Sequence, residues 1–245
     1  MHHKEIVLDG QKIAYYESTG KGHPVLFIHG NSLSSLCFEK QLTSRLGDQF
    51  RLVAMDLPGH GRSAPAHNPK SAYSIPAYAD IVTKFARALG LEAAVLVGWS
   101  LGGHILLETI KLLPQSPGTM IFGAPPVGKP MAPDAFMPNP LMPLLFSRVV
   151  GNDQAAALSA EFVLPGSKIP IFYAEDIQRT DGRAREELWV SIGQGIFTDE
   201  VKIVAEISGP LAIVQGEKDP LINLGLRIPL QIGHHFRFNS ATDSD

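Results

Sequence analysis

Four short, nearly continuous apolar runs in the first half of the chain constrain its fold more than any other feature. These runs are Val25–Ile28, Leu52–Met55, Ala94–Val97 and Thr119–Phe122. Apolar runs of this length are typical of parallel strands that are buried on both faces. Segments with helical character lie between them, at about Ser34–Leu46, Ile75–Leu89 and Leu101–Leu113. Strands that alternate with helices predict an α/β fold with a mostly parallel, doubly wound sheet.

The pattern changes at both ends of this region. Ile6–Leu8 and Ile13–Tyr16 flank Asp9-Gly10, which predicts an N-terminal β-hairpin. After Phe122 the chain becomes rich in Pro and Met, and the α/β rhythm returns only with a helix near 199–207 and a strand near 211–215. We therefore predict a core made of residues 1–124 and 196–235, a helical cap insertion at 125–195, and a disordered polar tail at 236–245.

Composition excludes several classes of protein. The 245 residues are 44% hydrophobic and 18% charged, as expected of a globular protein with a sizeable core. A net charge of −3 gives no reason to expect nucleic acid or an anionic membrane as a partner. Cys37 is the only cysteine, and no apolar stretch approaches eighteen residues, so a cytoplasmic protein is expected. The cluster of Arg179, Arg183 and Arg185, interleaved with acidic residues, predicts a solvated helix face.

Gly98-Trp99-Ser100-Leu101-Gly102 contains the motif most informative about chemistry. A G-x-S-x-G motif alone is weak, but this one follows a predicted strand and opens a predicted helix. A strained turn at that junction projects the serine hydroxyl from the carboxyl end of the sheet. The backbone N–H of Leu101, at the start of the helix, is then placed to stabilise an oxyanion. Ser100 is the candidate nucleophile.

Two further loops follow predicted strands. His29 is interpreted as a residue that braces its loop through hydrogen bonds rather than as a catalytic base. The loop from Asp56 to Ser63 is rich in turn residues, and its Asp and Arg are expected to tie the backbone together. An acid–base pair of Asp56 with His60 is the less favoured interpretation.

Four motifs together resemble the α/β-hydrolase superfamily, in order and over residues 5 to 222. They are His29-Gly30-Asn31, Asp56 through Ser63, Gly98 through His104, and Gln215-Gly216-Glu217-Lys218-Asp219-Pro220. The resemblance implies that Ser100 is the nucleophile, that Asp219 is the triad acid, and that the backbone N–H of Asn31 is a second oxyanion donor. His104 matches a position that is often histidine in such elbows without belonging to the triad.

Asp219 is also a candidate acid on its own chemistry. It lies on a turn after the strand Leu211–Gln215, so its carboxylate can reach the carboxyl edge of the sheet and hold an imidazole in the required tautomer. The alternative acid position, Gly123-Ala124-Pro125, holds no carboxylate.

The catalytic base is the weakest part of the pattern. In this fold the histidine follows the acid, and only His234 and His235 do so, with His234 the nominal match. Fourteen residues lie between Asp219 and His234, whereas a helix and a strand between acid and base need roughly 25–30. Three interpretations remain open: a short loop that still delivers His234, a truncated or frameshifted end that lacks the last strand and helix, and a protein without its base.

The predicted function is that of a serine hydrolase. It would cleave a small or medium ester, lactone or thioester through a Ser-His-Asp triad and an acyl-enzyme, with no metal or organic cofactor. The Phe, Leu, Met and Pro content of the predicted cap favours a small-molecule substrate with an apolar portion. Carbon–carbon bond hydrolases and perhydrolases use the same triad. The alternative from another class is a catalytically silent ligand-binding or interaction protein on this scaffold.

Overall fold

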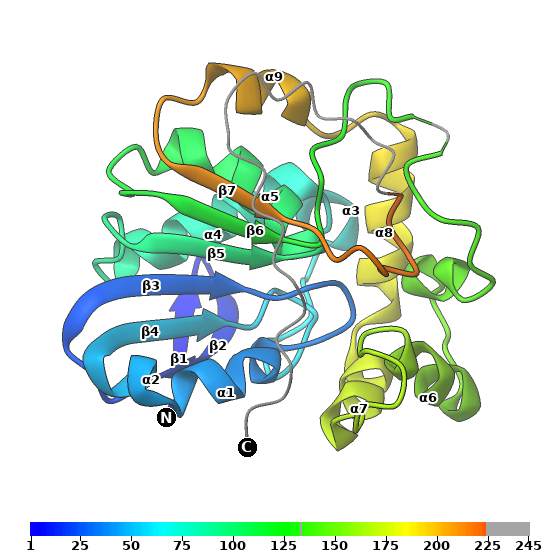
Figure 1. Cartoon of the computed structure of the whole chain (residues 1–245), viewed down its shortest axis with the longest axis horizontal. Coiled ribbons are helices and arrows are strands. Elements are labelled where there is room, and N and C mark those ends of the chain that lie inside the picture. The colour runs from blue at the N-terminus through cyan, green and yellow to red at the C-terminus, as the bar shows by residue number, and fades with distance from the viewer. Residues whose placement is uncertain (133, 224–245) are drawn as a thin grey trace.

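The computed structural model describes residues 1–132 and 134–223 (Figure 1). His234, His235 and the predicted tail at 236–245 lie outside the described residues. The strands are β1 (His2–Leu8), β2 (Gln11–Glu17), β3 (Gly22–Ile28), β4 (Phe50–Met55), β5 (Val95–Trp99), β6 (Thr119–Phe122) and β7 (Leu211–Val214). They form one sheet in the order β1-β2-β4-β3-β5-β6-β7. β1 and β2 are antiparallel to their neighbours, and β4, β3, β5, β6 and β7 run parallel.

The N-terminal hairpin follows its turn residues. Asp9 and Gly10 both have positive φ, 50° and 81°, as a two-residue type I′ turn requires. The pairing of Ile6 with Ile13 places both apolar side chains on the face that joins the core. The predicted hairpin is therefore confirmed.

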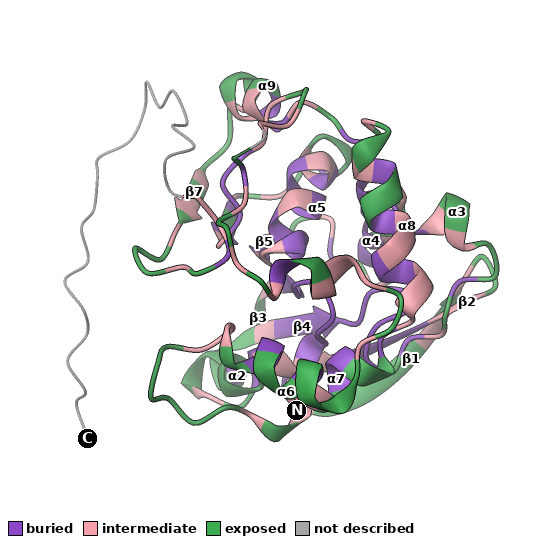
Figure 2. Ribbon diagram, turned by 90° about the vertical axis from the view of Figure 1, so that its right-hand side faces the viewer, coloured by how far each residue is buried: buried purple, intermediate pink, exposed green. Residues whose placement is uncertain are grey.

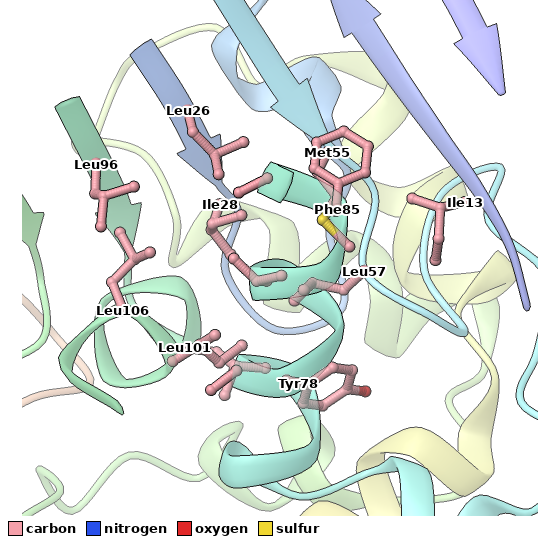
Figure 3. Close-up of a cluster of buried hydrophobic side chains, with 14 of the residues drawn as sticks. Ile13, Leu26, Ile28, Met55, Leu57, Tyr78, Phe85, Leu96, Leu101 and Leu106 are labelled. Atoms are coloured by element: carbon pink, nitrogen blue, oxygen red, sulfur yellow. The ribbon is translucent and has the colours of Figure 1, made fainter. Parts of the chain in front are cut away.

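Helices cover both faces of the sheet. Those of the first half are η1 (Ser35–Phe38), α1 (Glu39–Leu42), α2 (Arg45–Gln49), α3 (Pro69–Ala72), α4 (Ile75–Ala88), α5 (Leu101–Thr109) and η2 (Ile110–Leu112). On one face Leu26 and Ile28 of β3 pack against α4 and α5, and Figure 3 shows Phe85 and Leu106 of these helices pointing into the same cluster. On the other face Phe27 packs against Phe38 of η1. Alternate residues of a strand point to opposite faces, which explains the continuous apolar runs.

Figure 2 shows burial concentrated in the central strands and along the inner sides of α4 and α5. The bounds of α4 agree with its sequence signals, because the Ser74 hydroxyl accepts a hydrogen bond from the N–H of Ala77 and Gly90 follows with a φ of 64°. The single helix predicted at 34–46 is wrong. The chain instead forms η1, α1 and α2, because the Thr43 and Ser44 hydroxyls bond to nearby backbone groups and interrupt the helix.

The segment between β6 and the last helix contains no strand among its described residues. Its elements are η3 (Met142–Phe146), α6 (Asn152–Ala160), α7 (Ile171–Arg179) and α8 (Gly182–Gly193), and α9 (Glu200–Glu206) follows. Figure 1 shows α6, α7 and α8 on the side toward which the parallel strands point. Ala184 and Leu188 of α8 belong to the same buried cluster as the sheet and α4. The segment therefore packs on the sheet, while its limits as a cap remain a prediction.

The expected solvated arginine face is wrong at Arg185, which is only 2% exposed. Its guanidinium donates to the backbone carbonyls of Ser147, at 2.7 Å, and Ile177, at 2.9 Å. Arg185 therefore holds α8 to the end of α7 and to the chain after η3.

Candidate active site

The turn between β5 and α5 holds Ser100 in an unusual backbone conformation. Its φ of 52° and ψ of −121° lie in a region that non-glycine residues rarely adopt. The Ser100 N–H donates to the carbonyl of Phe122 on β6 at 2.8 Å, and its own carbonyl accepts from Gly103 at 2.7 Å. These bonds hold the strained turn between the sheet and the helix.

Glycines on either side of Ser100 permit close packing. A Cβ atom on Gly98 would lie 2.6 Å from the carbonyl oxygen of Gly102. A Cβ atom on Gly102 would lie 2.1 Å from the carbonyl oxygen of Ile28, at the end of β3. Both distances are far below contact, so only glycine fits and the elbow is held tightly against the sheet.

Ser100 lies at the wall of a cavity of about 790 Å³. Leu101, Asn31 and Asp219 line the same cavity, so four of the five predicted site residues lie around one space. Much of the rest of the wall is apolar and comes from the segment after β6: Met131, Phe136, Met142, Leu145, Phe146 and Phe162. A volume of this size and an apolar lining with few polar groups are typical of small-molecule sites.

The loop after β3 approaches Ser100 closely. A Cβ atom on Gly30 would lie 3.3 Å from the Cβ of Ser100. Asn31 is buried, and its side-chain amide donates to the carbonyl of Leu145 at 2.7 Å. The side chain of Asn31 is thus engaged with the segment after β6, while the residue keeps its place in the cavity wall.

Both ring nitrogens of His29 form hydrogen bonds with backbone groups. Nε2 accepts from the N–H of Leu57 at 3.0 Å, so the proton lies on Nδ1, which donates to the carbonyl of Gly30 at 2.8 Å. The predicted bracing role of His29 is confirmed. Burial lowers the pKa of this imidazole.

Asp56 acts on its loop and does not pair with His60. Its carboxylate accepts from the backbone and hydroxyl of Ser35, at 2.7 and 2.5 Å, and from the N–H of Arg62 at 2.8 Å. The Nδ1 atom of His60 lies 3.1 Å from the carbonyl of Pro58. Burial, with His29 nearby, lowers the pKa of His60 to about 3. The expected role of Asp56 in tying the backbone of this loop therefore agrees with the structure, and Arg62 contributes its backbone N–H.

Asp219 is held by its own turn. One carboxylate oxygen accepts from the backbone N–H groups of Leu221, at 2.9 Å, and Ile222, at 3.1 Å. The other accepts from the side-chain amide of Gln215 at 2.8 Å. Asp219 forms this Asx-turn and also lines the cavity, as Gly123 does. Its second carboxylate oxygen would lie 3.8 Å from a Cβ atom placed on Gly123.

His104 and Glu200 form a pair that sequence reasoning did not anticipate. The Nδ1 atom of His104 lies 3.0 and 2.9 Å from the two carboxylate oxygens of Glu200, which is fully buried. Burial lowers the pKa of His104, but the charge and hydrogen bond of Glu200 outweigh burial, and the pKa is raised above its ordinary value. His104 lines the cavity one helical turn after Ser100. Glu200 carried no sequence signal beyond its place in the first turn of a helix.

Two more contacts tie the segment after β6 to the loop after β3. The hydroxyl of Ser34 donates to the carboxylate of Asp176 on α7, and the guanidinium of Arg185 lies 3.4 Å from the hydroxyl of Ser32. Ser32 itself has a φ of 62°. With the bond from Asn31 to Leu145, three contacts join residues 31–34 to the helical segment.

Other kinds of site find no support in the described part of the chain. Within residues 1–132 and 134–223, no group of three or more His, Cys, Asp or Glu side chains could hold a metal ion. No helix among these residues is long and apolar enough to cross a membrane.

Comparison with known proteins assigns the family. Residues 25–238 match the alpha/beta hydrolase family, so the chain belongs to it. The predicted fold class, with its mostly parallel sheet, is confirmed. A bifunctional esterase/perhydrolase, DCH, from Acinetobacter calcoaceticus is 30% identical over 230 residues, which cover 87% of this chain and 81% of that enzyme.

Two other similar proteins are named as a lactonase and an esterase. A crystal structure of N-acyl homoserine lactonase AidH, complexed with N-butanoyl homoserine, is 37% identical with a TM-score of 0.86, covering 91% of this chain and 81% of that one. A pimeloyl-[acyl-carrier protein] methyl ester esterase from Stenotrophomonas maltophilia (strain R551-3) is 31% identical over 174 residues, which are 71% of this chain and 59% of that enzyme. The names of these relatives agree with the predicted class of ester-bond hydrolase.

Proposed function

We propose that the protein hydrolyses a carboxylic ester or lactone through an acyl-enzyme on Ser100. The observation that carries the proposal is the strained backbone of Ser100 at a strand–helix junction, which opens on a cavity of about 790 Å³. Backbone strain at such a junction exposes a nucleophile at the carboxyl end of the sheet. The relatives that act on esters and a lactone support the same class of reaction.

In the proposed reaction, the Ser100 oxygen attacks the carbonyl carbon while its proton passes to a histidine. The backbone N–H groups of Leu101 and Asn31 stabilise the oxyanion. The alcohol leaves with the proton from the histidine, and a water molecule then attacks the acyl-enzyme, returning serine and releasing the acid. This chemistry needs no metal or organic cofactor.

Asp219 and His234 are proposed to complete the triad. The turn of Asp219 holds its carboxylate at the cavity wall, where it could orient an imidazole. His234 lies outside the described residues, and among the described residues no hydrogen bond joins the Ser100 hydroxyl to a histidine. The assignment of His234 therefore rests on chain order and on its Gly-His motif.

The substrate is proposed to be a small or medium molecule with an apolar acyl portion. The apolar residues of the cavity wall come mainly from residues 125–195, which we propose to be the cap that encloses the acyl group. Because a solved structure of an N-acyl homoserine lactonase is 37% identical to this chain, lactones with an acylated amine are the first substrates to assay.

A fluorophosphonate probe tests the proposal. We expect the probe to label Ser100, with no labelling of Ser100→Ala, and we expect hydrolysis of short p-nitrophenyl esters. Ser116→Ala is the matched control, because that serine lies outside the cavity lining. A folded protein that resists the probe and hydrolyses no short ester would contradict the proposal and leave the binding-protein alternative.

Separate His234→Ala and His235→Ala variants assign the base. We expect the first to abolish labelling and the second to retain it. Labelling that is retained equally in both variants would rule out either histidine, acting alone, as the indispensable base.

A further inference from the structure

The His104–Glu200 pair is a polar group built into an otherwise apolar part of the cavity wall. Glu200 is fully buried at the start of α9, and its carboxylate accepts from the backbone N–H of Val127 at 2.8 Å as well as from His104. Val127, which donates this bond, and Phe197, which precedes Glu200 in the sequence, are apolar and line the cavity. The proposed triad does not use either residue.

The burial of Glu200 favours a positive charge on its partner. An isolated carboxylate that is removed from water is strongly unfavourable unless it is paired. Among the described residues, the only cationic group within ion-pair distance of Glu200 is His104, at 2.9 Å. The charge and hydrogen bond of Glu200 therefore raise the pKa of His104 above its ordinary value and favour the protonated imidazole, whose charge Glu200 balances.

The hydrogen bonds also determine which ring nitrogen faces the cavity. Nδ1 donates to Glu200, and the protonated ring that Glu200 favours carries Nε2–H as a second donor. The His104 side chain is 18% exposed and lines the cavity, so this donor is accessible from the substrate side. His104 lies in the first turn of α5, four residues after Ser100, which immediately precedes the helix, and both residues line the cavity.

The charges around the cavity favour a neutral acceptor over an anion. Glu161, Glu217 and Asp219 also line it, with Lys218 as the one cationic chain among the lining residues besides His104. A neutral pair beside three carboxylates offers little attraction for an acidic substrate, whereas a single Nε2–H donor in an apolar wall fixes a carbonyl oxygen well.

We infer that His104, held by Glu200, determines specificity by binding a second, neutral carbonyl oxygen of the substrate. This oxygen, of an amide or a ketone, lies on the acyl side of the bond that is cleaved. The inference rests on the proposed ester hydrolysis and names its substrate class: acyl esters or lactones that carry a second carbonyl several bonds away.

Two esters of equal length test this inference. One is the p-nitrophenyl ester of an N-acyl-β-alanine, which has an internal amide, and the other is the p-nitrophenyl ester of the straight-chain acid. For His104→Phe, we expect the ratio of kcat/KM, amide ester over plain ester, to fall about tenfold or more, mainly through KM. His104→Gln, which keeps a donor, should retain part of the ratio. His67→Gln removes an exposed histidine and should leave the ratio unchanged.

Three outcomes would overturn the inference. The first is an unchanged ratio in folded His104→Phe. The second is loss of probe labelling at Ser100 in that folded variant, which would make His104 a base. If His104→Phe does not fold, the variants His104→Gln and Glu200→Gln test the inference in its place. The third outcome is then a kcat/KM ratio that is unchanged in both of these variants.

Failure of the proposed function is separately visible. If the wild-type protein hydrolyses neither ester, ester hydrolysis fails, and binding decides the role of His104. Ketone analogues of the two esters, in which carbon replaces the ester oxygen, form a pair that cannot be hydrolysed. Their binding is measured by calorimetry. Tighter binding of the amide-bearing ketone by the wild-type protein than by the His104 variants supports the inference, and equal binding contradicts it.

Discussion

The hydroxyl of Ser34 donates a hydrogen bond of 2.5 Å to the carboxylate of Asp176, which follows it by 142 residues. Asp176 is 1% exposed, and burial raises its pKa from 3.8 to about 6, with the Ser34 bond opposing only in part. Asp56, whose carboxylate binds the neighbouring Ser35, raises the pKa further. An acid on α7 is thus joined to the loop that carries the candidate oxyanion donor.

Asp176→Asn should not lose stability at neutral pH. The folded state holds the proton of Asp176 more tightly than the unfolded chain, so stability falls as pH rises from about 4 to about 6, by on the order of 2–3 kcal/mol. Asparagine keeps an acceptor for Ser34 without the buried charge. Urea unfolding at pH 4.5 and 7.5 should show a smaller pH difference for this variant than for wild type, and exposed Asp153→Asn should match wild type. A large loss of stability at pH 7.5 would contradict this account.

Gly102→Ala should destabilise the elbow severely. The new Cβ would lie 2.1 Å from the carbonyl oxygen of Ile28, so α5 must move away from β3. We expect a loss of about 3 kcal/mol or more in the free energy of unfolding. Gly193→Ala is the matched control, since a Cβ there meets nothing within 4 Å, and alanine in a helix should be neutral or stabilising by up to about 1 kcal/mol. Chemical denaturation of both variants checks the contrast, and similar losses would refute it.

Arg185→Met should weaken the packing of the helical segment. Methionine keeps part of the apolar stem but leaves the carbonyls of Ser147 and Ile177 without their donor. Two buried acceptors of this kind are expected to cost about 2–4 kcal/mol. The exposed Arg179→Met should change the free energy of unfolding by less than about 0.5 kcal/mol. Equal stability of the two variants would mean that the bonds of Arg185 contribute little.

His60 should make the fold sensitive to acid. Burial lowers its pKa from 6.5 to about 3, so the folded state excludes a proton that the unfolded chain accepts. The stability from neutral His60 is fully present above pH 6.5 and is lost as pH falls toward 3. His60→Phe should be less stable at pH 7, because the contact with Pro58 is lost, but its stability should fall less steeply between pH 6.5 and 4. Thermal unfolding across this range measures the slope, and parallel slopes would disprove the assignment.

Local signals explain the parts of the fold that the sequence predicted well. The turn at Asp9-Gly10 and the glycines around Ser100 act within a few residues, so their effects can be read from short segments. The break at Thr43 and Ser44 is not predicted, because hydroxyl-to-backbone bonds there compete with a continuous helix.

Long-range contacts explain what was missed in the site. Glu200 lies 96 residues from His104, Asp176 lies 142 from Ser34, and Arg185 lies 153 from Ser32. Such partners depend on how α7, α8 and α9 pack, which no local pattern specifies. Chain order alone points to His234 as the base, and that residue stays a prediction.

The three contacts from residues 31–34 to the helical segment have a kinetic consequence under the proposed mechanism. Asn31 binds Leu145, Ser34 binds Asp176, and Arg185 reaches Ser32, so the loop and the segment move together. A ligand too bulky for the cavity would push the segment outward and draw Asn31 away from the nucleophile. Oversized molecules would then bind and yet react slowly, so discrimination by size would be seen in kcat as well as in affinity.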